Sequence, residues 1–586
     1  MEFDKDLRSI QEARNLMQNA VVAQKELATY TQEQVDAICK AMCQACVAKA
    51  EPLAKMAQEE TGFGRWQDKV LKNLLGSQIV YDSIKDMKTI GVLSEDPVNK
   101  VMEVAVPMGV VVALIPSTNP TSTVMYKSLI SVKAGNSIVI SPHPGAMNSI
   151  LATVKVLQDA AAKAGAPDNL IQVVETPSKQ STDTLMKHKN TGIILATGGE
   201  AMVRAAYSSG NPALGVGPGN GPCFIEKSAN IPLAVKRIFD SETFDNGTIC
   251  ASEQSIITQS CIKDAVVAEL QRQGGYFMTK EESDKVAGYI MRANNTMNPA
   301  IVGKSAQVIA DMAGITIPAG TKVLLTEHTG IGKNQPYSRE KLCPILAFFT
   351  VNDWEEACEK AIELLTNEGS GHTMCLHSQD ERIIREFALK KPVSRVLVNT
   401  PGALGGVGAT TGLNPALTLG CGAVGGSATS DNVGPMNLIN IRRMAYGIQE
   451  LDDIRALGEK ITGSTLEGAV KSTIARTETT PYGTKKVYGT VGSSGKAANP
   501  VPVTTSQPYN TVIKQANYTQ KPKGSFAYTR KPGYSEHVGI NNGQVAVHTG
   551  GAGQVTSAPA KQEQFSEQDV ADLTREIVNR ILGNQK

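Results

Sequence analysis

A cysteine at position 250 ends a polar turn and could act as a nucleophile. It stands in F-D-N-G-T-I-C-A-S-E-Q, residues 244–254, three residues after Gly247 and just before the mostly apolar run 255–257. A thiol at such a turn can face backbone N–H groups, which lower its pKa and favour the thiolate that attacks a carbonyl carbon. Because the chain has ten cysteines, this assignment needs support from other segments.

Two strand ends and a glycine-rich strip could place further groups beside this thiol. Asn119 follows an expected strand, and its amide could donate to an oxyanion together with the backbone N–H of the nucleophile; alone, Asn-Pro is usually a turn. Residues 196–200, A-T-G-G-E, end another strand and open a helix, whose N-terminus could meet a phosphate or a cofactor ring. The strip G-V-G-P-G-N-G-P, residues 215–222, predicts a tightly folded loop that allows close backbone approach.

Apolar strands alternate with helices in the part of the chain that carries these turns. Continuous apolar strands separated by helices indicate a parallel sheet covered on both faces, so the predicted fold class is α/β with a Rossmann-like nucleotide-binding layout. A second α/β stretch is expected at residues 222–400, before a glycine-rich segment at 400–435. The expected strands are 109–115, 137–141, 170–174 and 192–196, and the expected helices lie within 7–57, 123–134 and 148–164.

Composition excludes several classes of protein. A chain of 586 residues predicts about three or four domain-sized units. A net charge of +2 gives no reason to expect nucleic acid or an anionic membrane as a partner. No apolar run approaches the roughly 18 residues of a membrane span. The scattered cysteines and the lack of a signal-peptide pattern at the N-terminus favour a reducing, cytoplasmic setting.

No metal site is expected. Cys39, Cys43 and Cys46 have the spacing of one helix face, which is more often buried packing than a set of ligands. A G-x-G-x-x-G match at Gly420, Gly422 and Gly425 is rejected as a dinucleotide fingerprint, because no helix is expected after it.

A series of motifs makes residues 7–447 resemble the aldehyde dehydrogenase superfamily, specifically its CoA-acylating branch. The cysteine segment is the most specific of them. The others are I-P-S-T-N-P-T-S-T at 115–123, S-P-H-P at 141–144, A-T-G-G at 196–199, G-V-G-P-G-N-G-P at 215–222, E-K-L-C-P-I-L at 340–346, G-H-T at 371–373 and S-D-N-V-G-P at 430–435.

The resemblance implies roles for individual residues. Cys250 is the nucleophile, Asn119 and the Cys250 amide form the oxyanion hole, and Glu340 helps to hold the nicotinamide ribose. His372 either assists deprotonation of a thiol or is a structural turn histidine. The implied NAD-binding residues are Pro116, Ser117, Ser141, His143, Thr197, Gly198, Gly199, Gly217 and Glu340.

Two departures from the hydrolytic branch of the superfamily change the implied reaction. The glutamate that activates water there has no counterpart in residues 215–222, so the acyl group is expected to pass to coenzyme A instead. Ser141 replaces the usual lysine that contacts the adenosine ribose, and the acylating branch commonly uses NAD. The implied reaction converts a short aldehyde, acetaldehyde or propionaldehyde, with NAD and coenzyme A to acyl-CoA and NADH through a cysteine thioester.

Other reactive residues receive structural interpretations. Glu253, close to the nucleophile, is expected to anchor the loop. Cys343, Cys375 and Cys421 are expected to be packing residues.

The composition changes after about residue 463. Glycine, serine, threonine, proline, asparagine and tyrosine dominate up to about residue 560, which predicts a flexible, mildly basic tether. An RNA-binding role for it is disfavoured, because the charge is sparse and no RNA-binding motif occurs. Residues 566–569 then fit a capping box, and Val570, Leu573, Ile577 and Ile581 share one face of a helix. We expect this helix to dock on a partner; the alternatives are packing on its own chain or self-pairing.

The resemblance extends to this tail. Acylating aldehyde dehydrogenases of bacterial microcompartments resemble this chain in carrying an amphipathic targeting helix on a flexible linker. It implies shell proteins as partners, a location in the lumen of a microcompartment, and a homo-oligomer, dimer or tetramer. The predicted domains are 1–228, mainly NAD-binding with an oligomerisation strand near 98–108; 229–420, catalytic; 421–462, oligomerisation arm and core segment; 463–562, linker; and 563–586, targeting helix.

Two other functions remain open from the sequence. One is a reductase of the same superfamily that uses an acyl phosphate. The other is a compartment scaffold with a vestigial active site, against which the intact Cys250 and Asn119 argue.

Overall fold

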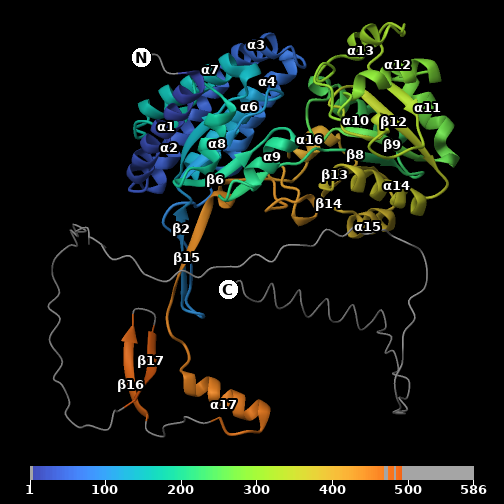
Figure 1. The fold of residues 1–586 in the computed structure, drawn as a ribbon. Coiled ribbons are helices and arrows are strands. Elements are labelled where there is room, and N and C mark those ends of the chain that lie inside the picture. The colour runs from blue at the N-terminus through green and yellow to red at the C-terminus, as the bar shows by residue number, and fades with distance from the viewer. Residues whose placement is uncertain (1–3, 467–472, 481–482, 491–586) are drawn as a thin grey trace, which may run out of the picture. The chain divides into compact units, whose positions relative to one another are not determined.

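The computed structural model describes residues 4–466 with side chains, and residues 473–480 and 483–490 as backbone. Figure 1 gives the order of the elements. The predicted targeting helix at 563–586 and most of the predicted linker lie outside the described residues.

A parallel five-stranded sheet carries the first group of turns. Its strand order is β5-β4-β3-β6-β7. The four strands predicted from the sequence are confirmed to within one residue at each end, whereas β7 is too short to give a sequence pattern. The strands are β3 (Val110–Leu114), β4 (Ser137–Ser141), β5 (Ile171–Val173), β6 (Thr191–Ala196) and β7 (Ala213–Gly215).

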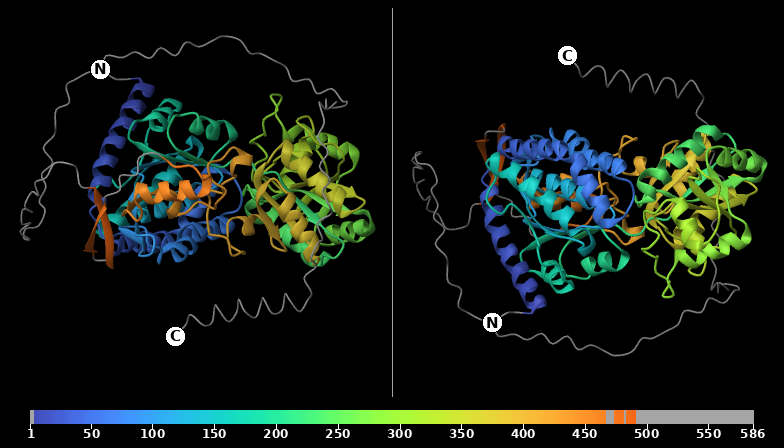
Figure 2. Two further views of the ribbon diagram at one scale, coloured as in Figure 1. Left: turned by 90° about the horizontal axis from the view of Figure 1, so that it is seen from below. Right: turned by 90° about the horizontal axis from the view of Figure 1, so that it is seen from above.

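Helices cover both faces of this sheet, as its continuous apolar strands predict. Val111 and Ala113 of β3 share a core with α2, α6 and α7, while Val110 and Val112 face α1, α8 and α9. Figure 2 shows α1 as one long helix running from the N-terminus beside this part of the fold. These helices are α1 (Lys5–Leu27), α2 (Gln32–Ala48), α6 (Pro120–Lys133), α7 (Met147–Lys163), α8 (Lys179–Lys187) and α9 (Glu200–Tyr207).

Further helices after α2 complete the N-terminal region. They are α3 (Ala50–Thr61), α4 (Trp66–Leu74), the π-helix η1 (Leu75–Ile79) and α5 (Val80–Ile84).

Lys127 of α6 joins two strands of the sheet from within the core. Its side chain is fully buried, and Nζ donates to the carbonyl oxygens of Leu114 and Leu195, each at 2.8 Å. Leu114 ends β3, and Leu195 lies one residue before the end of β6. Burial lowers the pKa of Lys127 well below its ordinary value. The ends of both strands are therefore tied to the same side chain.

A second parallel sheet, of seven strands, forms the second α/β stretch. Its order is β10-β11-β12-β9-β8-β13-β14. The strands are β8 (Gly221–Ile225), β9 (Glu253–Gln259), β10 (Gly275–Phe277), β11 (Val323–Glu327), β12 (Ile345–Val351), β13 (Gly371–His377) and β14 (Val393–Val398). The helices are α10 (Ile231–Thr243), α11 (Lys263–Arg272), α12 (Lys280–Ile290), α13 (Ala306–Ala313), α14 (Trp354–Asn367), α15 (Glu381–Lys390) and α16 (Gly402–Gly406).

A three-stranded antiparallel sheet joins segments that are far apart in the sequence. β2 (Val101–Pro107) lies between β1 (Val92–Asp96) and β15 (Ile439–Ala445), and β15 pairs along its whole length with β2. After β15 comes α17 (Leu451–Thr462), on which Leu451, Ile454 and Leu457 are more than half exposed.

The segment expected to be a featureless tether contains a hairpin. β16 (Thr473–Thr480) and β17 (Gly483–Thr490) pair antiparallel over their full length. These two strands fall within the predicted linker, residues 463–562, most of which lies outside the described residues. Threonine and other β-favouring residues recur in both strands, which overall composition conceals.

Other sequence interpretations hold. Cys39, Cys43 and Cys46 are all buried in α2, so the C-x-x-C spacing of the last two belongs to a packed helix face. The rejected glycine match at Gly420–Gly425 contains a short 3-10 turn, Ala423–Gly425, and no helix follows it directly. Among the described residues, no helix has both the length and the apolar character that crossing a bilayer requires.

Candidate active site

A cavity of about 370 Å³ brings most of the predicted site residues together. The loop after β3, the turn after β6, the strip before β8 and the turn before β9 all contribute to it. The predicted residues that line it are Pro116, Ser117, Asn119, His143, Thr197, Gly198, Gly199, Gly217, Cys250 and Glu340.

Cys250 lies in the turn between the 3-10 helix Phe244–Gly247 and β9. This turn is held by a hydrogen bond of 2.9 Å from the Ser252 N–H to the Ile249 carbonyl. Burial, with Glu340 as the second cause, raises the pKa of the Cys250 thiol to about 12. The thiol is therefore protonated at neutral pH in the protein alone, contrary to the lowered pKa that the turn suggested.

Asn119 precedes the first turn of α6 and lines the same cavity. Its Nδ2 donates to the Thr248 carbonyl at 3.1 Å and to the Thr118 hydroxyl at 3.2 Å, and its Oδ1 accepts from Lys72 Nζ at 2.6 Å. The amide is thus held by contacts on both its oxygen and its nitrogen.

Glu340 is the only carboxylate among the described residues that line this cavity. Its Oε1 accepts a hydrogen bond of 2.8 Å from the Gly219 N–H. Burial, with a smaller effect of Glu368, raises the pKa of Glu340 to about 8. The next residue, Lys341, donates its N–H to Gln254 Oε1 at 2.8 Å. Since Gln254 belongs to β9, the acid is positioned relative to the cysteine turn.

Gly219 allows the glycine-rich strip to approach the nucleophile. A Cβ on Gly219 would lie 1.8 Å from the Cys250 carbonyl oxygen. The predicted loop at 215–222 is shorter than expected, because Gly215 ends β7 and Gly221 begins β8. Gly217, in contrast, has open space where a side chain would stand.

The turn after β6 suits a phosphate-bearing cofactor. Thr197, Gly198 and Gly199 line the cavity, and Gly199 is the N-cap of α9 without a side-chain hydrogen bond to the helix. The first N–H groups of α9 are therefore available to an anion. Gly199 also has no neighbour within 4 Å where a Cβ would stand. These residues fit the dinucleotide that the sequence predicts.

Ser141 and His372 do not line the cavity. The Ser141 hydroxyl is buried 2.9 Å from that of Thr182. His372 is buried behind Gly219, with Nδ1 3.0 Å from the Thr373 hydroxyl. Burial, with Arg395 as a second cause, lowers the pKa of His372 to about 3. This placement favours the structural alternative for His372.

Most of the remaining cavity wall is apolar, with Thr118, Thr123 and Thr248 as polar members. The apolar residues were not identified from the sequence. These residues come from loops scattered along the chain, so no local sequence motif predicts that they line one cavity. The apolar members are Phe63, Val216, Ile249, Met297, Pro299, Val302, Leu342, Val407, Leu417 and Leu419. No lysine or arginine occurs among the described lining residues.

A second cavity, of about 710 Å³, shares Gly217 and Pro218 with the first. Its lining includes Arg204 of α9 together with Lys333 and Arg339. Arg339 pairs with Glu368 at 3.1 Å. The two cavities together offer room for a molecule longer than the aldehyde.

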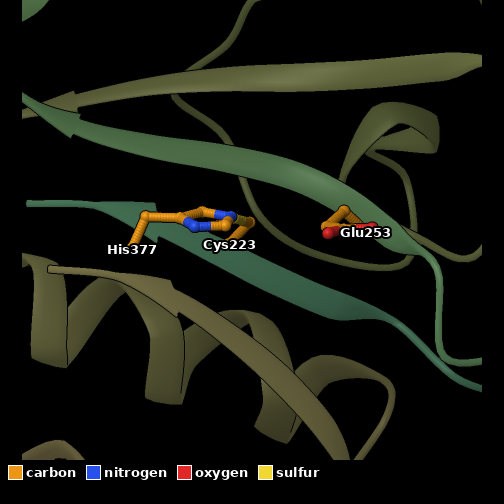
Figure 3. Close-up of side chains that lie close together, drawn as sticks. All are labelled: Cys223, Glu253 and His377. Carbon is orange, nitrogen blue, oxygen red and sulfur yellow. The ribbon is translucent and has the colours of Figure 1, made fainter. Parts of the chain in front are cut away.

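Glu253 anchors a loop, as the sequence suggested. Its Oε1 accepts from the Gly402 N–H at 2.9 Å, which holds the start of α16 against β9. Its ligand atoms, with those of Cys223 and His377, lie within 4.8 Å of one another (Figure 3). Three donors are one fewer than a structural zinc site uses, and a catalytic zinc needs an open position. All three side chains are buried, so the cluster resembles neither kind of site.

Comparison with known proteins agrees with the geometry. The model of the aldehyde dehydrogenase family matches residues 7–414. The bifunctional aldehyde-alcohol dehydrogenase AdhE of Escherichia coli K12 is 44% identical over 442 residues, 75% of this chain and 50% of that protein. The succinate-semialdehyde dehydrogenase (acetylating) of Clostridium kluyveri is 40% identical, covering 74% of this chain and 95% of that protein. The chain thus spans about half the length of the first curated relatives that it matches.

Solved structures agree as well. An acetylating aldehyde dehydrogenase from Geobacillus thermoglucosidasius is 52% identical with a TM-score of 0.76, covering 77% of this chain and 99% of that one. A propionaldehyde dehydrogenase from the fucose utilisation microcompartment of Clostridium phytofermentans is 26% identical with a TM-score of 0.67, covering 75% of this chain and 98% of that one. Since the family model matches over two thirds of the sequence, the chain belongs to the aldehyde dehydrogenase family.

Proposed function

We propose that this protein is a CoA-acylating aldehyde dehydrogenase that converts a short, neutral aldehyde to acyl-CoA with reduction of NAD. The observation that carries the proposal is the cavity in which Cys250 and Asn119 meet without a carboxylate free to activate water. Glu340 is the one described acid in that wall, and its Oε1 is bonded to Gly219.

Cys250 forms and later breaks the covalent bond to the acyl group. The Cys250 thiol first releases its proton, which is the proton of the overall balance. The thiolate then attacks the aldehyde carbonyl, and the resulting oxyanion accepts hydrogen bonds from the Asn119 amide and the Cys250 N–H. The oxyanion can replace the Thr118 hydroxyl, which is one of the two acceptors that Nδ2 now has. Loss of a hydride from the tetrahedral carbon leaves a thioester on the sulfur.

NAD, when bound, supplies the chemistry of a hydride acceptor. The residues that fit it are Thr197, Gly198 and Gly199 with the open N-terminus of α9, the open backbone at Gly217, and the Glu340 carboxyl for ribose hydroxyls.

Transfer to coenzyme A is favoured over hydrolysis. The Oε1 of Glu340, the one described acid in the cavity wall, already accepts the Gly219 N–H, so this oxygen is not available as a base for water. A thiol that replaces Cys250 at the carbonyl exchanges one thioester for another. The overall balance is aldehyde, NAD and coenzyme A thiol giving acyl-CoA, NADH and a proton.

The wall of the cavity supports an uncharged substrate. Its acyl side is formed by groups such as Phe63, Val302 and Leu417, and no lysine or arginine lies among the described lining residues. An anionic aldehyde would lose hydration there without gaining a partner. Acetaldehyde and propionaldehyde therefore fit better than succinate semialdehyde, the substrate named for the relative from Clostridium kluyveri.

A coupled assay tests this proposal. Purified protein is incubated with NAD or NADP, coenzyme A and aldehydes of two to six carbons, and NADH and acyl-CoA are both measured. We expect one acyl-CoA per NADH, and kcat/KM for propionaldehyde well above that for succinate semialdehyde. Reduction of acetyl phosphate but not acetyl-CoA in the reverse direction would reject coenzyme A as the acceptor. Inactivity with every aldehyde would favour the scaffold alternative.

We further propose that the enzyme works in the lumen of a bacterial microcompartment, where its C-terminal segment binds shell proteins. The support is the amphipathic pattern at residues 563–586 and the likeness to the propionaldehyde dehydrogenase of such a compartment. Deleting residues 565–586 is expected to leave the activity of the purified enzyme intact and to abolish co-purification with shells. Undiminished co-purification would reject the targeting role.

A further inference from the structure

A cluster of buried charges lies directly behind the Asn119 wall of the cavity. Lys69 and Lys72 of α4 and Asp245 of the turn before Cys250 are 2%, 1% and 0% exposed. Burying charges is costly unless they are paired and hydrogen-bonded. The proposed mechanism uses none of these three residues, so their burial calls for another explanation.

Lys72 has an acceptor for each of its three ammonium protons. Nζ lies 2.5 Å from Asp245 Oδ2, 2.6 Å from Asn119 Oδ1 and 2.9 Å from the Thr248 hydroxyl. One side chain therefore connects the loop after β3 with the turn that leads into Cys250.

The contact with Lys72 determines which way the Asn119 amide faces. An ammonium can only donate, so the amide atom beside it has to be the oxygen. The nitrogen then donates to the Thr248 carbonyl and the Thr118 hydroxyl, both of which belong to residues that line the cavity. A reversed amide would direct N–H groups at the ammonium and present an acceptor to a developing oxyanion.

Asp245 is itself held firmly. Its Oδ1 accepts a hydrogen bond of 2.7 Å from the Arg65 N–H. Gly64, the residue before Arg65, packs so closely that an added Cβ would lie 1.8 Å from the same oxygen. Burial alone would raise its pKa, but Lys72 and Lys69 hold the pKa of Asp245 below its ordinary value. Asp245 also has a φ of +51°, which is unfavourable for a residue with a side chain.

Lys69 provides a comparison within the same cluster. Its Nζ lies 2.9 Å from the same Asp245 Oδ2, but its other acceptor is the Thr118 carbonyl at 3.0 Å. In the described contacts it does not reach the Asn119 side chain. Both lysines therefore pair with the buried Asp245 carboxylate, but only Lys72 also contacts the Asn119 amide.

We propose that Lys72, anchored by Asp245, is a positioning residue that keeps the Asn119 nitrogen directed at the carbonyl oxygen of the group bound to Cys250. This inference rests on the acyl-transfer role proposed for Cys250. Lys72 acts through Asn119 and not by contact with the substrate.

Lys72→Met is the variant that tests the inference, and Lys69→Met is its matched control. Either substitution leaves one lysine to neutralise Asp245, so a folded protein is expected from both. If Lys72→Met does not accumulate as folded protein, Lys72→Gln takes its place with the same expected outcomes.

Three measurements separate positioning from general structural damage. The first is kcat for acyl-CoA formation. The second is the burst of p-nitrophenol when p-nitrophenyl acetate acylates Cys250, which needs an oxyanion hole but neither NAD nor coenzyme A. The third is alkylation of Cys250 by iodoacetamide, a displacement that forms no oxyanion.

We expect Lys72→Met to lower kcat and the acylation burst rate by about 10- to 100-fold, somewhat below the effect of deleting an oxyanion donor. Alkylation is expected to stay within about twofold of the parent, and Lys69→Met is expected to lose clearly less activity than Lys72→Met. Adding Lys72→Met to Asn119→Ala is expected to lower the burst rate little further, because both changes remove the same hydrogen bond from the Asn119 amide to the oxyanion.

A folded Lys72→Met protein with a burst rate within threefold of the parent would overturn the inference. So would losses that multiply in the double variant, or an equal loss in Lys69→Met. Failure of the proposed function has a different signature. In that case the parent makes no acyl-CoA from any aldehyde, while the ester burst still reports on Lys72 and Asn119.

Discussion

The Glu340 carboxyl accepts a hydrogen bond of 2.8 Å from the Gly219 backbone, and this contact joins two walls of the cavity around Cys250. Gly219 in turn lies against the Cys250 carbonyl. The acid, the strip and the nucleophile are therefore fixed relative to one another. One carboxyl can in this way control the protonation of the thiol as well as the shape of the site.

Replacing Glu340 by Gln is expected to make Cys250 more reactive at alkaline pH. Ionised Glu340 raises the pKa of Cys250, and Glu340 itself ionises near pH 8. A neutral Gln removes the repulsion between the Glu340 charge and the Cys250 thiolate. The pKa of Cys250 then falls, and the thiolate fraction increases by about tenfold for each unit of that fall. The difference between the two proteins is expected above pH 8 and to be small at pH 6, where Glu340 is already neutral.

Iodoacetamide labelling of the peptide that contains Cys250, measured from pH 6 to 10, checks this expectation. Glu281→Gln, an exposed acid on α12, is the control. Superimposable profiles for the parent and Glu340→Gln would contradict an electrostatic link between the two groups.

Cys250→Ser is expected to abolish acyl-CoA formation, with a loss of at least about a thousandfold, because a serine hydroxyl at this position has no base to activate it. Cys261→Ser is the matched control, since Cys261 is the exposed cysteine among the described ones. Its turnover is expected to match that of the parent. Turnover of Cys250→Ser at the parental rate would exclude Cys250 as the nucleophile.

Gly219→Ala and Gly217→Ala are expected to fail in different ways. A Cβ on Gly219 would meet the Cys250 carbonyl at 1.8 Å, and overpacking of this kind costs about 1–3 kcal/mol of folding free energy. We expect a lower melting temperature and a lower kcat. A Cβ on Gly217 meets no protein atom within 4 Å, so Gly217→Ala is expected to keep the melting temperature and to raise KM for NAD. Thermal unfolding and steady-state kinetics distinguish the two variants. Equal melting temperatures would show that the glycine-rich strip can move to make room for a Cβ at position 219.

Phe63→Ala is expected to shift the preference toward longer aldehydes. Phe63 is the one aromatic side chain among the described residues of the cavity wall. Removing it makes room for additional methylene groups, each of which can change kcat/KM by about tenfold in an apolar pocket. The ratio of kcat/KM for hexanal to that for acetaldehyde measures the effect. An unchanged ratio would place the acyl chain elsewhere in the cavity.

The sequence predicts the parts of the site that are local. Asn119 and the turn at Thr197–Gly199 follow neighbouring parallel strands of one sheet, whose ends meet at the same edge. Cys250 stands before β9 of the other sheet and is recognised by its own turn. The five-stranded sheet can be predicted because its strands have continuous apolar runs, as in β3 and in the centre of β4. Side-chain direction is not local. His372 and Ser141 stand in the expected motifs, yet both point into packed surroundings.

Ion pairs between residues that are far apart in the chain cannot be predicted from the sequence pattern. Lys69 and Lys72, three residues apart, look like the solvated face of a helix, and lysines are rarely buried. Only the fold brings Asp245, more than 170 residues later, to within hydrogen-bonding distance of both. The raised pKa of Cys250 has the same origin, because burial is a property of the packed chain.

The single amine of Lys127 joins two loops that have different tasks. It donates to the carbonyl of Leu114, which leads to the oxyanion amide, and to the carbonyl of Leu195, which leads to the turn for the cofactor. Spreading the two loops apart would leave this fully buried amine without its hydrogen-bond partners. We therefore expect the glycine backbone at residues 198, 199 and 217 to accommodate a bulky cofactor, because the Lys127 contacts oppose any widening between the oxyanion amide and the cofactor turn.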